Sequence, residues 1–192
     1  MQAVSDEQLI QWVANGDASC LGTLFERHHK GLYNYCLQLT RQPSQSEDLV
    51  QELFLRLLKR AGTFRGESSF KSWAYHILRN MTFDQLRKAK RQRTQTDAEA
   101  LIAESLVDAR TAEQAAAGQQ SLQLLASCLA RLPIEQQEII WLGRFEFPDY
   151  RSLAAALGCT AATARVRMHR AMQALGVGYD QINAGAADVG SN

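Results

Sequence analysis

The sequence predicts an all-α protein made of two small helical domains joined by a flexible acidic linker. Apolar residues recur at helical spacing along most of the 192 residues, and the chain contains only three prolines. No sustained alternation of apolar and polar residues indicates a strand. A polar, acidic, alanine-containing segment over 94–111 marks the boundary, which gives domains over 1–93 and 112–176 and a flexible tail over 177–192.

Four helices are expected in the first domain. The first begins at Ser5 and ends before Gly16, and the second covers about 17–40. Ser44, with Glu47 three residues later, forms a capping box that would open the third helix. Its buried stripe is expected to contain Leu49, Val50, Leu53, Phe54, Leu57 and Leu58. The fourth helix begins near Ser69, with core positions at Phe70, Trp73, Ile77 and Met81.

The second domain ends in a helix-turn-helix pattern. A helix begins near Ala112, and Pro133 is expected at the first position of the next helix, where its missing N–H costs nothing. A short helix over 150–157 is followed by the turn at Gly158. Thr160 then caps the last helix, which is expected to fray beyond Leu175.

Composition limits the class of protein. The N-terminus lacks the basic start and apolar stretch of a signal peptide, and no apolar run could span a membrane, so we expect a cytoplasmic protein without membrane insertion. The four cysteines are scattered and the four histidines lack metal spacing or a partnered nucleophile. The prediction is therefore a protein that is not an enzyme and uses no metal or cofactor.

The net charge of +1 is an average over basic and acidic residues that lie in separate parts of the sequence. A basic cluster ends the first domain, and an acidic stretch follows it. A local positive patch is typical of phosphate binding, although a basic cluster alone is more often a solvated helix end. The cluster consists of Arg87, Lys88, Lys90, Arg91 and Arg93.

Three ordered motifs carry a resemblance to a known family. They are SEDLVQELF over 46–54, FKSWAYHILRN over 70–80, and the pair YRSLA over 150–154 with TARVRMHRA over 163–171. In this order they resemble bacterial extracytoplasmic-function (ECF) sigma factors of the sigma-70 superfamily. The resemblance implies a sigma2-like and a sigma4-like domain. It also implies binding to core RNA polymerase, recognition of minus-ten and minus-thirty-five promoter DNA, and promoter melting to initiate transcription.

A polymerase-binding face is expected on the third helix. Asp48, Gln51, Glu52 and Leu55 fall at helical spacing on the side opposite part of the buried stripe. Taken alone, Asp48 is better explained as a first-turn acid favoured by the helix dipole. The resemblance implies that this face meets the polymerase clamp.

The fourth helix and the loop before it are the expected minus-ten site. Asn80, Asp84 and Arg87 line up on one side, and the resemblance implies that this side reads the element while loop 63–68 receives an extruded base. Extrusion costs a few kcal/mol of unstacking, which a pocket must offset. Phe64 is the candidate for stacking and Arg65 for a phosphate or base contact. Trp73 is either a core residue or a wedge, and the remaining basic candidates are Lys88, Lys90 and Arg91.

The last helix is the expected minus-thirty-five site. Thr163, Arg165 and Val166 lie near its N-terminal end, where residues meet base edges in the major groove. Arg165 and Arg167 are about 200° apart on a helix, so they cannot face the same part of the DNA and must make different contacts. Arg167 and Arg170 are expected to hold phosphates.

The length of the linker gives an independent test of whether the two domains could bind two separated promoter elements. About 18 residues of relaxed coil span only roughly 24 Å, whereas elements two helical turns apart are separated by about 68 Å. Something must hold the linker stretched, and the resemblance implies that core polymerase does so. It also implies control by an anti-sigma factor. The alternative is an autonomous helix-turn-helix regulator, which would bind duplex DNA tightly without polymerase.

Overall fold

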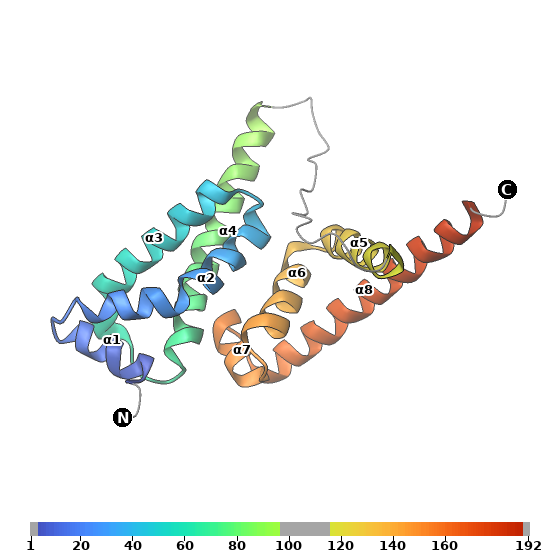
Figure 1. The fold of residues 1–192 in the computed structure, drawn as a ribbon. Coiled ribbons are helices and arrows are strands. Elements are labelled where there is room, and N and C mark those ends of the chain that lie inside the picture. The colour runs from blue at the N-terminus through green and yellow to red at the C-terminus, as the bar shows by residue number, and fades with distance from the viewer. Residues whose placement is uncertain (1–3, 97–115, 190–192) are drawn as a thin grey trace.

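The computed structural model describes residues 4–96 and 116–189, and within these residues every regular element is a helix. The first module contains α1 (Asp6–Ala14), α2 (Cys20–Thr40), α3 (Pro43–Arg60) and α4 (Phe70–Thr96). The second contains α5 (Ala116–Arg131), α6 (Ile134–Trp141), α7 (Tyr150–Leu157) and α8 (Ala161–Val189). Figure 1 shows the two modules side by side. The predicted all-α, two-domain architecture is confirmed, while most of the predicted linker lies outside the described residues.

The first module is built on the packing of α2 against α3, with α1 and α4 packed on this pair. Leu24, Leu32, Leu53, Leu57 and Leu78 are completely buried. Burial of a leucine side chain contributes roughly 1.5 to 3 kcal/mol, so this apolar core is the main source of the module's stability. No helix in the described parts of the chain has the length and apolar character needed to cross a membrane.

The start of α3 differs from the predicted capping box. The helix begins at Pro43 after an N-cap at Gln42, which makes no side-chain capping bond. Pro43 suits the first turn because its fixed φ is helical and an N–H is not needed there. The buried Ser46 hydroxyl donates to the Gln42 carbonyl over 2.8 Å. The predicted stripe is buried except for Leu58, which is 42% exposed.

The second module confirms the helix-turn-helix and changes two boundaries. Thr160 accepts a hydrogen bond from the Thr163 amide over 3.1 Å, as expected for the cap of α8. Pro133 is the N-cap of α6 and not its first residue. The expected frayed tail is wrong as a description of the structure, because α8 continues to Val189. The glycines in the C-terminal turns of α8 would weaken these turns. The packing of α5 along α8, with Tyr179 partly buried, stabilises them.

The two modules are docked through α4 and α7, which lie side by side, and through α2 and α6 (Figure 1). Gly158 ends α7 with a φ of 66°. This left-handed conformation suits glycine, and a Cβ added there would lie only 2.7 Å from His76 Cε1 on α4. The turn of the helix-turn-helix therefore also sets how closely the modules approach.

We predict that Gly158→Ala lowers the melting temperature and loosens the docking. A left-handed conformation costs an L-residue about 1 to 2 kcal/mol, and the new methyl group would also crowd His76. Thermal unfolding and small-angle scattering measure the two effects. Gly62→Ala is the control, because Gly62 has open space around it. Equal melting temperatures for the two variants would contradict the prediction.

Candidate nucleic-acid and polymerase interfaces

Most of the predicted minus-ten residues of α4 form an exposed surface that runs from Asn80 to Arg91. Asn80 lies beside His76, with 3.4 Å between Nδ2 and Nε2. Asp84 pairs with Arg87 along the helix. The side chains exposed on this surface are Asn80, Asp84, Arg87, Lys88, Lys90 and Arg91. The structure thus brings these predicted residues together on a basic surface accessible to a polyanion.

The loop before α4 separates its two candidate residues. Arg65 is exposed, but Phe64 is only 6% exposed and its ring lies 5.2 Å from that of Trp73. Trp73 is half-buried and also contacts Phe70. Gly66 bends the loop with a φ of 72°. Phe64 and Trp73 therefore form a packed aromatic pair beneath the loop. The exposed surface of the loop is made by the residues that follow Phe64.

The predicted polymerase face of α3 is exposed. Asp48, Gln51, Glu52 and Leu55 are all at the surface, and Glu52 pairs with Arg56 over 2.8 Å. Leu55, which was predicted on this face, is 54% exposed, whereas Leu58 was predicted in the buried stripe and is 42% exposed, so the apolar part of the surface is larger than expected. The helical periodicity contained the signal for Leu55 but not for Leu58, which falls at the edge of the buried stripe.

On α8, the arginines face different sides, as the helical spacing predicts. The Arg165 guanidinium lies 5.4 Å from the centre of the Tyr150 ring. Arg167 and Arg170 instead line a cavity of about 400 Å³ that Arg79 and Glu138 also line. Thr163 is half-buried at the start of the helix, and Val166 is 49% exposed.

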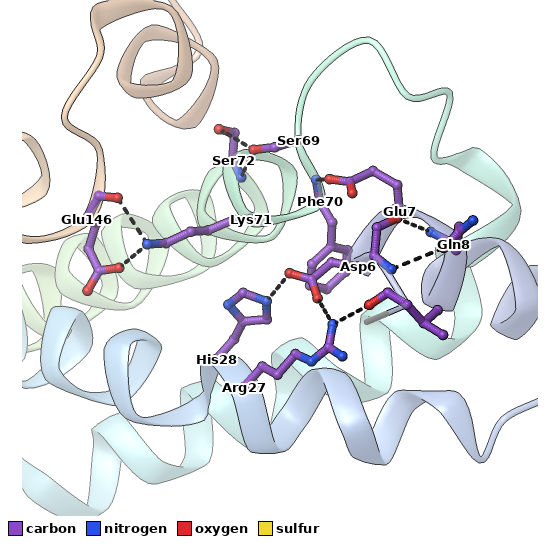
Figure 2. Close-up of polar contacts among 12 residues, drawn as sticks. Asp6, Glu7, Gln8, Arg27, His28, Ser69, Phe70, Lys71, Ser72 and Glu146 are labelled. Carbon is purple, nitrogen blue, oxygen red and sulfur yellow. Dashed lines mark hydrogen bonds and ion pairs between the residues drawn. The ribbon is translucent and has the colours of Figure 1, made fainter. Parts of the chain in front are cut away.

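The second module covers the N-terminal half of α4. Lys71 Nζ lies 2.7 Å from Glu146 Oε2 and donates to the Glu146 carbonyl over 3.0 Å (Figure 2). Glu146 occupies the π-helical turn Leu142–Glu146 that precedes α7. The Ser72 hydroxyl donates to the Ser152 carbonyl over 3.1 Å. One helix therefore provides both a docking surface and the basic surface described above.

A buried carboxylate also joins the two modules. Glu138 on α6 is 1% exposed; its Oε1 accepts from the Tyr35 hydroxyl over 2.7 Å and lies 2.9 Å from Arg79 Nε. Glu138 was not among the residues predicted from the sequence, although it stands one helical turn from Ile134 and Leu142 and thus on an apolar side of its helix. Buried charges need such partners, so these contacts hold the docked arrangement in one register.

Within the described residues, no group of three or more histidine, cysteine, aspartate or glutamate side chains could hold a metal ion. Two helical modules, one with a basic helix surface and one with a helix-turn-helix, define a bipartite DNA-binding protein.

Comparison with known proteins gives the family. Residues 24–92 match Sigma-70 region 2, and residues 122–175 match Sigma-70, region 4. The RNA polymerase sigma-H factor of Pseudomonas aeruginosa is 26% identical over 176 residues, which cover 88% of this chain and 91% of that protein. The ECF RNA polymerase sigma-E factor of Escherichia coli is 25% identical over 181 residues, 91% of this chain and 94% of that protein.

A solved structure agrees with these matches. The sigma factor RpoE of Bartonella quintana, in complex with the anti-sigma factor NepR, superposes with a TM-score of 0.65 at 26% identity, covering 83% of this chain and 96% of that one. The chain belongs to the sigma-70 family as an ECF RNA polymerase sigma factor, and it acts in transcription initiation. The predicted family and function are confirmed, as is the prediction that the protein is not an enzyme.

We predict that Glu138→Ala separates the modules. The change leaves Arg79 without its carboxylate and Tyr35 without its acceptor, and breaking such a buried pair costs about 3 to 5 kcal/mol. Small-angle scattering should show a larger radius of gyration. Glu135→Ala removes an exposed acid from the same helix and should leave the radius unchanged. Equal radii for the two variants would refute the importance of Glu138.

Docking should also depend on pH. Burial raises the pKa of Glu138 above its ordinary value of 4.5, and Arg79 and Tyr35 only partly oppose this effect. Because the docked pKa is the higher one, the docked state binds a proton more tightly than the separated state. Docking should therefore strengthen as pH falls through the docked pKa toward 4.5 and weaken as pH rises again.

Fluorescence energy transfer between the modules, measured from neutral to mildly acidic pH, checks this dependence. Glu138→Gln should flatten the profile, since it removes the titrating group and keeps an oxygen acceptor for Tyr35. An equally steep profile in this variant would assign the pH dependence to another group.

Proposed function

We propose that this sigma factor binds the polymerase clamp through α3, reads and opens the minus-ten element through α4 and the loop before it, and reads the minus-thirty-five element through α8. The observation that carries the proposal is the placement of three exposed surfaces on three helices of two modules. Such an arrangement suits a protein that contacts one large partner and two separated stretches of DNA.

At the minus-ten element, Arg65 and Asn80 contact the unpaired strand, and the basic residues farther along α4 hold phosphates. Phe64 supports the loop from below together with Trp73, and its burial favours this role over stacking from the surface. Trp73, half-buried beside it, is the candidate wedge against the last paired base. Asp84 holds Arg87 in position through their ion pair.

At the minus-thirty-five element, Thr163, Arg165 and Val166 meet base edges at the start of α8. Arg167 and Arg170, on another side, hold phosphates. These two arginines line a cavity with Arg79 and Glu138 of the docked interface. Promoter elements two helical turns apart are separated by about 68 Å, so promoter binding separates the modules, and core polymerase holds the linker extended between them.

The chain works in the cytoplasm, where core polymerase is found. An anti-sigma factor that favours the docked arrangement of the two modules would prevent promoter binding, and the complex of RpoE and NepR offers a parallel.

The polymerase surface is tested by the double variant Asp48→Lys and Glu52→Lys. Reversing two charges of a complementary interface should weaken binding to core polymerase by roughly tenfold or more. Both residues are exposed, so the melting temperature should stay unchanged. Glu26→Lys, an exposed acid on α2, is the matched control. Unchanged affinity of the double variant would exclude this face.

Promoter opening is tested by Arg65→Ala combined with Asn80→Ala. Both side chains are exposed, so their removal avoids the cavity that truncating Phe64 would create. We expect normal polymerase binding and closed complexes but fewer open complexes, with partial rescue on a promoter that contains a pre-melted bubble. Permanganate footprinting measures this. Wild-type opening of duplex DNA by the variant would contradict the proposed role of the loop.

A further inference from the structure

Helix α1 is fixed firmly on the first module. Asp6 Oδ1 accepts from Arg27 Nη1 over 2.6 Å, and its Oδ2 lies 2.6 Å from His28 Nε2 (Figure 2). Leu9 and Ile10 are 5% and 0% exposed on the side that faces the core. Two polar contacts and a buried apolar side therefore fix the position of α1 relative to α2.

Glu7 extends from α1 to the first turn of α4. Its Oε1 accepts a hydrogen bond from the backbone N–H of Phe70, the first residue of that helix, over 3.0 Å (Figure 2). Ser69 accepts from the Ser72 amide over 3.1 Å, so two of the helix's unpaired N–H groups are satisfied. A carboxylate at this end is also favoured by the helix dipole. The point where the loop becomes α4 is thus held by α1.

Gln11 holds the other end of the same loop. Its Nε2 donates to the carbonyl of Phe64 over 3.3 Å. Glu7 and Gln11 are one helical turn apart on α1. A single helix therefore hydrogen-bonds to the backbone on both sides of residues 65–69. Arg65 and Glu67 between these two points are exposed, and Gly66 makes the bend.

We propose that Glu7 and Gln11 are positioning residues for promoter melting, which hold loop 65–69 in the shape that receives the extruded base. The inference rests on the proposed role of this loop. A loop with fixed ends loses less conformational entropy when it captures a base, so capture is tighter than it would be for a free loop.

The test uses holoenzyme and a forked promoter whose non-template minus-ten strand is single-stranded. Affinity is measured for intact DNA and for DNA with an abasic site at each unpaired position in turn. Wild type should lose affinity at the position that the loop captures. Glu7→Ala should bind intact DNA about tenfold more weakly, as expected for losing a hydrogen bond to a charged group. It should lose little more at the abasic site, because capture is already impaired.

Gln11→Ala should show the same pattern with a smaller loss, while Glu7→Gln should recover most of the affinity because it retains an oxygen acceptor. Glu26→Ala should behave as wild type. If Glu7→Ala and Gln11→Ala lose the same factor at the abasic site as wild type does, α1 has no part in capture and the inference is overturned. If no abasic position weakens wild type, the proposed role of the loop fails and this inference fails with it.

Discussion

The carboxylate of Glu138 places the strongest constraint on this structure. It is buried between the two modules, and the module that carries it does not supply the partners that a buried charge needs. The Tyr35 hydroxyl and the Arg79 guanidinium come from α2 and α4, whereas the carboxylate comes from α6. A buried charge is tolerated only where partners replace the water it has lost. The modules are therefore held in one relative position or released from it, and an intermediate separation would leave the charge without either protein partners or full hydration.

Helix α4 connects this constraint to function. Its first turn contacts the second module through Lys71 and Ser72, and farther along the helix it presents the surface that begins at Asn80. Movement of the second module away from α4 would expose Tyr35 and Tyr75, whose rings lie 5.8 Å from Trp141 and 5.2 Å from Phe147. The packing of α3 on α1, α2 and α4 would remain, since all four helices belong to the first module. The fold can thus change the distance between its two DNA-binding surfaces without unfolding either one, as a factor that bridges two promoter elements requires.

Much of this architecture could be predicted from local sequence signals. Periodicity gave the α3 stripe, Thr160 gave the start of α8, and α7 has the predicted bounds. What local signals could not give is anything set by contacts between distant segments. Phe64 was predicted to stack on an extruded base, yet it is buried and its ring packs against Trp73. The capping role of Glu7 on α4 joins residues far apart in sequence, and no spacing rule reveals such a contact.

The most direct test of the proposed separation of the modules is the distance between them, measured before and after assembly with core polymerase and promoter DNA. Spin labels at the exposed positions Glu26 on α2 and Gln173 on α8 would report it by electron double resonance. We expect one short distance in the free chain and one much longer distance in the promoter complex, with the transition complete before the DNA opens. An unchanged distance in a complex that initiates transcription from both promoter elements would contradict it.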